Sequence, residues 1–187
     1  MLGRVVLAAL LCVAAPLFVD SAPAQIVAET QAARLGRLFA ELKAAPDEQT
    51  ADAIGSQIWS EWLHPEDPEL DALMQRVLLL RSIGQTAASL DLLNDIIVDY
   101  PDYAEAWTQR ATLHYLNSDF EASLADIEKT LELEPRHFGA LSGRVLIHLA
   151  RGERELALRD MNAALALHPF LAERALFPEL RQETVNI

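Results

Sequence analysis

The sequence has a single cysteine, Cys12, and aromatic residues make up only 6% of its 187 residues. It lacks a Ser-His-Asp ordering, a glycine-rich phosphate loop, a Cys-His pair and a zinc-protease helix, so it offers no catalytic residues and predicts a protein that is not an enzyme. It is also poor in basic residues: 15 Lys and Arg stand against 28 Asp and Glu, a net charge of −13. That charge repels phosphate backbones and argues against nucleic-acid binding.

The remaining composition is that of a folded chain. Hydrophobic residues make up 51% and charged residues 23%, which excludes wholesale disorder. The length suits one domain or at most two small ones.

The first 24 residues have the pattern of a cleavable secretory signal. Arg4 precedes an apolar run over 5–19, and Ala-Pro-Ala at 22–24 offers the small side chains that signal peptidase accepts. The run is about 15 residues, shorter than the roughly 20 needed to span a bilayer, so a retained membrane anchor is the alternative. Thirteen Arg against two Lys suggest a GC-rich bacterial coding sequence. We therefore expect a secreted or periplasmic protein.

A period of 34 residues organises the chain after residue 69. Each unit, 70–103, 104–137 and 138–171, has apolar residues at three- and four-residue steps on both sides of a break, which predicts two amphipathic helices. A repeated helix pair predicts an all-α helical solenoid. The columns that mark the period are Pro101, Pro135 and Pro169; Gly84, Ser118 and Gly152; and Leu73, Trp107 and Leu141.

At these columns the chain resembles the tetratricopeptide repeat (TPR) family. The middle unit matches best, with Trp107 in the aromatic column, Ala111 in the small-residue column and Leu-Glu-Leu-Glu-Pro at its close over 131–135. The resemblance covers 70–171 strongly and 26–69 weakly. It implies a right-handed solenoid of about three helix hairpins, whose first helices line a concave groove for a peptide or partner protein.

Flanking segments complete the predicted stack. Residues 25–69 predict an N-terminal helix pair, a degenerate repeat or a cap, and end in a connector with two prolines. Residues 172–187 are expected to form a C-terminal capping helix and tail, the helix itself extending over 170–183, with Pro178 bending or restarting it.

The resemblance also implies which residues face the groove. The family's chaperone-binding members hold a terminal carboxylate with Lys, Asn and Arg, whereas here Leu78, Thr112 and Leu146 replace asparagine and the lysines are missing. A peptide with apolar anchors fits this strip better. The predicted groove residues are Asp71, Met74, Leu78, Arg81, Glu105, Thr108, Thr112, Tyr115, Gly139, Ser142, Leu146 and Leu149.

An arginine ladder departs from the family pattern: Arg76, Arg110 and Arg144 replace its leucine. Asp126 and Asp160 recur at the same spacing, while Asp91 is one residue out of register. One hypothesis is a repeated, partly buried Arg-Asp ion pair that fixes packing. The alternative is an arginine strip that grips carboxylates of a ligand.

Two further patterns have ordinary structural interpretations. His114 and His148 share a column, but two histidines without a third ligand rarely hold zinc, so we predict no metal and no cofactor. Residues 44–109 contain thirteen acidic residues against two arginines. A solvated acidic face explains this, and steering of a basic partner is the alternative.

Taken together, these patterns predict an exported protein–protein interaction scaffold that binds an unknown protein or peptide in its groove. A membrane-anchored envelope assembly factor with an uncleaved N-terminal helix is the alternative, and an enzyme ranks last.

Overall fold

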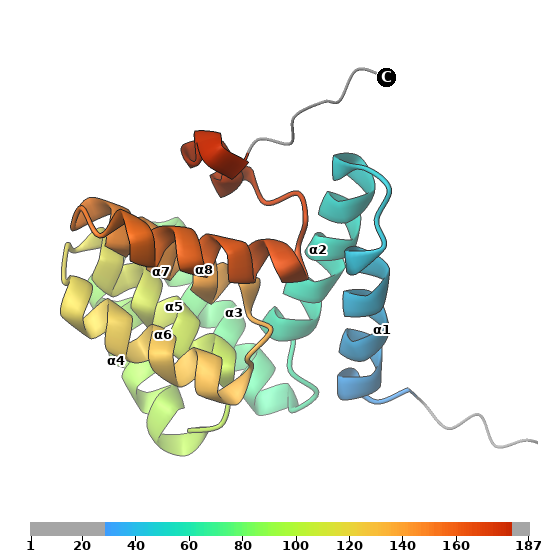
Figure 1. Ribbon diagram of the computed structural model, residues 1–187. Coiled ribbons are helices and arrows are strands. Elements are labelled where there is room, and N and C mark those ends of the chain that lie inside the picture. The colour runs from blue at the N-terminus through green and yellow to red at the C-terminus, as the bar shows by residue number, and fades with distance from the viewer. Residues whose placement is uncertain (1–28, 181–187) are drawn as a thin grey trace, which may run out of the picture.

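The computed structural model describes residues 29–180, and over this range it is all-α, as predicted (Figure 1). The predicted signal over 1–24 and the end of the predicted C-terminal tail, 181–187, lie outside the described residues. The helices are α1 (Gln31–Lys43), α2 (Glu48–Leu63), α3 (Pro68–Ser82), α4 (Thr86–Asp99), α5 (Ala104–Leu116), α6 (Phe120–Leu133), α7 (Phe138–Ala150), α8 (Arg154–Leu167) and the short 3-10 helices η1 (Ala172–Leu176) and η2 (Pro178–Leu180). Within 29–180, no helix is long and apolar enough to cross a membrane.

Each predicted unit is a helix hairpin, and the hairpin turns explain the period. Gly84, Ser118 and Gly152 all have a positive φ, of 73°, 61° and 75°. Glycine adopts this left-handed conformation without a Cβ penalty, and it allows the chain to leave one helix and start the next. Each helix pair ends shortly before the repeating proline, which cannot continue a helix. The helix pairs therefore follow the 34-residue period, and α3 begins at Pro68, two residues before the first predicted unit.

The units stack through small and apolar residues. Trp107 and Leu141 are each the fourth residue of their helices, α5 and α7, so they occupy equivalent places in successive hairpins. Ala111 and Ala157 are buried where helices cross, as expected for close backbone approach.

Two of the three arginines in the repeated column, Arg110 and Arg144, form ion pairs within their own hairpins. Arg110 makes two hydrogen bonds to the Asp126 carboxylate, at 2.8 and 2.7 Å, and Arg144 pairs with Asp160 in the same way, at 2.6 and 3.0 Å. Each pair joins the two helices of one hairpin. Arg76 is exposed and has no such partner within the described residues, because the acid of its unit is displaced by one position. The ion-pair hypothesis is thus confirmed for the second and third units and wrong for the first.

The C-terminal segment caps the last hairpin and restarts at Pro178, as expected, but over 172–180 it is not one continuous helix. Residues 172–180 form two short 3-10 helices, because Pro178 has no N–H and excludes the α-helical turn before it. Phe177 is completely buried against α7 and α8, and the Arg154 guanidinium lies 5.2 Å from its ring centroid. The segment therefore shields the end of the stack.

The N-terminal hairpin packs mainly on the third unit. Its apolar core, including Leu38, Phe39 and Ile58, encloses Phe138 of α7, and Leu167 at the end of α8 packs against it. Figure 1 shows α2 beside this end of α8. Among the described residues, the core cluster of α1 and α2 contains no residue of α3 or α4. The N-terminal hairpin therefore contacts the last unit of the array as well as α3, which follows it in sequence.

Candidate functional site

A buried polar and aromatic cluster joins α2 to α7. The Trp62 and His137 rings stack with centroids 4.0 Å apart. His137 Nδ1 accepts the backbone N–H of Ala140 at 3.0 Å, so its proton is on Nε2, which lies 3.0 Å from Glu105 Oε2. The Tyr103 hydroxyl donates to the Trp62 carbonyl at 2.7 Å, and burial raises the pKa of this phenol. These contacts hold the end of α2 against the starts of α5 and α7.

Trp59, one turn before Trp62, forms a wall of the candidate site. A Cβ at Gly139 would lie 2.5 Å from Trp59 Cη2, so the indole reaches its place only because position 139 has no side chain. The sequence predicted Gly139 in the groove without predicting its partner.

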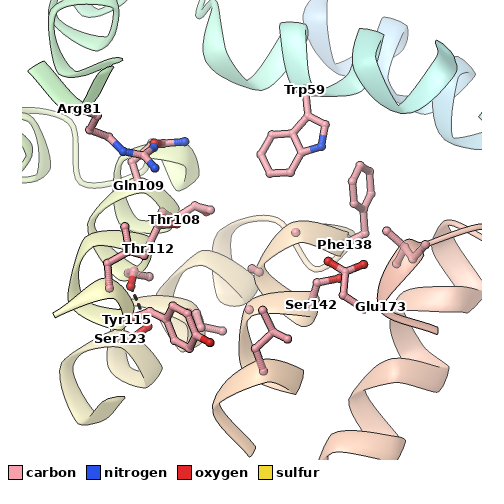
Figure 2. A pocket seen from close by; sticks show the side chains of 18 residues that line it. Trp59, Arg81, Thr108, Gln109, Thr112, Tyr115, Ser123, Phe138, Ser142 and Glu173 are labelled. Atoms are coloured by element: carbon pink, nitrogen blue, oxygen red, sulfur yellow. Dashed lines mark hydrogen bonds between the residues drawn. The ribbon is translucent and has the colours of Figure 1, made fainter. Parts of the chain in front are cut away.

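Below Trp59 lies a pocket of about 510 Å³ between α2, α5 and α7, and its size and partly apolar lining are those of a ligand site. Figure 2 shows Trp59 facing Phe138, and Arg81 across the pocket from Glu173. The lining residues are Trp59, Arg81, Thr108, Gln109, Ala111, Thr112, Tyr115, Leu116, Ser123, Ile127, Phe138, Gly139, Ala140, Ser142, Gly143, Leu146, Leu171 and Glu173.

The structure brings one part of the predicted groove together and separates the rest. The predicted residues that line the pocket are Arg81, Thr108, Thr112, Tyr115, Gly139, Ser142 and Leu146. Met74 is instead completely buried in the core of α3, α4 and α5, and Glu105 is 1% exposed against His137. Leu149 packs into the core of the last hairpin, Asp71 accepts a hydrogen bond from Gln75 near the connector, and Leu78 is partly buried outside the pocket.

The periodic pattern missed the walls that come from outside the repeats. Trp59 belongs to the N-terminal hairpin, and Glu173 belongs to the C-terminal segment. No 34-residue spacing fixes the position of these segments. The one available signal was the amphipathic pattern of α2, which leaves Trp59 at the edge of its buried face.

The polar groups of the pocket lie on two sides, with Arg81 and Gln109 on one and Ser142 across from them (Figure 2). Arg81 is partly buried, and burial lowers the pKa of its guanidinium while the Glu105 carboxylate acts in the opposite direction. Gln109 Nε2 donates to Glu105 Oε1 at 2.5 Å, which leaves Gln109 Oε1 facing away from that carboxylate. Within the described residues, Gln109 Oε1 and Ser142 Oγ are buried without a hydrogen-bond partner.

The two histidines of the shared column, His114 and His148, each lie beside an acidic residue of their own hairpin. His148 Nδ1 lies 2.6 Å from Glu153, and His114 lies 3.8 Å from Asp126. Over residues 29–180, no group of three His, Cys, Asp or Glu side chains is placed to hold a metal ion.

A second cavity, of about 450 Å³, shares Trp59 and Phe138 with the first pocket and is also lined by His168. The His168 ring is buried, with its centroid 5.3 Å from that of Phe138, and its Nδ1 accepts the N–H of Phe170 at 3.3 Å. Burial lowers the pKa of His168 below its ordinary value of 6.5, and Asp52 opposes this only partly.

His168 is therefore expected to make the fold less stable in acid. Because its pKa is lower in the folded state, the unfolded chain binds the proton more readily. Its contribution is full above pH 6.5 and is lost as pH falls through the folded-state pKa. His168→Asn keeps an acceptor for Phe170 and removes the titration. Chemical denaturation at about pH 7.5 and about pH 5 should show a smaller stability loss for the variant; equal losses would contradict this.

A comparison with known proteins decides the family. The chain is 37% identical over 154 residues to a TPR repeat-containing protein of Rhizobium etli, and the match covers 82% of this chain and 72% of the relative. The chain belongs to the tetratricopeptide repeat family. This TPR protein is thus a helical solenoid of the class that serves as a protein–protein interaction scaffold.

Other comparisons add less. No family model matches the TPR chain. The crystal structure of MamA has 16% identity and a TM-score of 0.49 over 73% of this chain and 77% of that one. A MamA RS-1 double mutant has 15% identity and a TM-score of 0.49 over 80% and 79%.

Proposed function

We propose that this TPR protein is an exported scaffold that docks a segment of a partner protein in the pocket between α2, α5 and α7. The observation that carries the proposal is the pocket itself, where aromatic walls from Trp59 and Phe138 meet polar atoms of Gln109 and Ser142 that have no hydrogen-bond partner among residues 29–180. An apolar cavity with a few convergent polar groups is the usual form of a binding site. Export is supported by the signal-like pattern of residues 1–24.

Filling the pocket tests the docking proposal. Gly143 lines the pocket, and a Cβ there would make an ordinary 3.5 Å contact with Ile127, so the helix accepts a side chain. We expect Gly143→Phe to occupy the cavity and abolish partner capture, whereas the matched control Gly143→Ala adds one methyl and keeps it. In a cross-linking pull-down from the cell envelope, read by mass spectrometry, a partner held by Ala and lost with Phe supports docking here. The same partners with both variants would contradict it.

The second candidate is a membrane-anchored envelope assembly factor with the same pocket. It is favoured by the apolar run over 5–19, if that run is retained. N-terminal sequencing of the exported protein separates the two: a chain that begins at Gln25 supports the cleaved scaffold, and one that begins at Met1 supports the anchor.

A further inference from the structure

The guanidinium of the pocket makes no direct ion pair within the described chain, and the Glu105 carboxylate acts on it only from beyond 4.0 Å. Arg81 is the only Lys or Arg among the residues that line the cavity, and within the described chain no carboxylate lies within 4.0 Å of it. By contrast, Arg110 and Arg144 are satisfied by buried aspartates. A partly buried guanidinium without an anion in direct contact has given up water without a full replacement, and it favours a ligand that brings a carboxylate.

Two neutral polar groups extend this pattern. Gln109 and Ser142 are each 6% exposed, and Gln109 Oε1 and Ser142 Oγ have no hydrogen-bond partner within the described residues. Figure 2 shows Gln109 next to Arg81, with Ser142 across the pocket near Phe138. Leaving a buried polar atom unpaired is costly, so such atoms in the wall of a cavity favour a ligand that hydrogen-bonds to them. A peptide backbone supplies the required N–H and C=O groups.

The other walls fit an apolar side chain. Trp59, Phe138 and Leu146 line the cavity around the small residues Gly139 and Ala140. Leu116, at 66% exposure, and the partly exposed Glu173 also belong to the lining, so a bound chain could continue toward solvent beside each of them. An opening on two sides suits an internal segment of a bound peptide rather than a peptide terminus.

We infer that the pocket binds an internal peptide segment in which an Asp or Glu lies next to an apolar residue. The side-chain carboxylate binds Arg81, a backbone N–H donates to Gln109 Oε1, and the apolar side chain packs between Trp59, Phe138 and Leu146. This inference rests on the proposed docking function and specifies its ligand. The bidentate geometry of guanidinium with carboxylate makes the charge contact selective as well as attractive.

The test uses hexapeptide pools acetylated at the N-terminus and amidated at the C-terminus, so that every carboxylate is a side chain. One pool has Glu-Leu fixed at its centre and the other Gln-Leu, with the remaining positions random among neutral residues. Retention on the immobilised full-length protein is read by mass spectrometry. Wild type is expected to retain the Glu-Leu pool roughly tenfold or more over the Gln-Leu pool, the scale of a charge-assisted hydrogen bond.

Variants of Arg81 assign the preference to its side chain. Arg81→Gln should remove the preference, Arg81→Lys should reduce it, and Arg76→Gln, at an exposed position on the same helix, should keep it. Circular dichroism and thermal melting verify folding, and Arg81→Lys keeps the test decisive if Arg81→Gln unfolds. A preference that survives Arg81→Gln would overturn the inference.

Gly143→Phe separates this inference from the proposed function. If both pools bind equally and Gly143→Phe abolishes their binding, the pocket docks peptides but the carboxylate assignment is wrong. If wild type retains neither pool beyond the level of Gly143→Phe, the assignment and peptide docking both fail.

Discussion

Replacement of Arg110 or Arg144 by methionine is expected to lower the free energy of unfolding by about 3 kcal/mol in each case. The aspartates they pair with, Asp126 and Asp160, are 4% and 2% exposed, and each accepts two hydrogen bonds from its arginine. Methionine fills similar space but removes both hydrogen bonds and the adjacent guanidinium from a buried carboxylate, and Arg159, whose Nε lies 3.6 Å from Asp160 Oδ1, makes no hydrogen bond in their place. The cost therefore comes from the unpaired charge that remains, rather than from the net value of the ion pair.

Arg76→Met is the matched control, because Arg76 occupies the same column but is exposed and makes no such pair within the described residues. We expect a change within about 0.5 kcal/mol. Urea denaturation of the three variants measures these differences. Similar small effects at all three positions, with loss of ligand binding at Arg110 and Arg144, would instead favour the arginine strip for ligand carboxylates.

Trp62→Ala is expected to lower the free energy of unfolding by about 3–5 kcal/mol. The indole is 7% exposed, stacks on His137 and contacts Phe39 and Phe138, with ring centroids 6.0 and 5.2 Å away. Its loss leaves a cavity between the N-terminal hairpin and the third unit. The hairpin should then be released before the repeats unfold, which limited proteolysis would detect as early cleavage near the connector over 64–67.

Trp62→Phe provides the control for this change. The Trp62 Nε1 donor is buried without a partner within 29–180, so phenylalanine sacrifices no hydrogen bond and keeps an aromatic face against His137. We expect roughly half or less of the alanine effect, with a protease pattern like that of wild type. Equal destabilisation by both variants would show that the aromatic stack does not hold the hairpin.

The repeats could be predicted from the sequence because one geometry recurs three times. The left-handed turn at Gly84, Ser118 and Gly152 and the proline that follows each second helix are local requirements, so they appear directly as residue columns. The family resemblance then placed the first helices on the concave side, and much of the candidate site followed from that.

The parts that could not be predicted depend on contacts between distant segments. Nothing local indicates that Trp59 lies on Gly139, or that Glu105 turns away from solvent to pair with His137. Met74 was expected in the groove because its column faces the concave side in the later units. In the first unit that position packs into the core formed with α4 and α5. The end of the chain differed as well, since Pro178 allows the 3-10 turns that bury Phe177 but no continuous α-helix.

The contact between Phe39 and Phe138, with ring centroids 6.3 Å apart, fixes the number of repeats. An open solenoid can gain or lose a unit because each unit touches only its neighbours. Here an inserted or deleted unit would move α7 away from α1 and α2. Duplication of a unit would therefore break the contact between the N-terminal hairpin and α7. Synthesis imposes an order as well: α1 and α2 leave the ribosome first, but their docking surface is complete only after α8 has emerged.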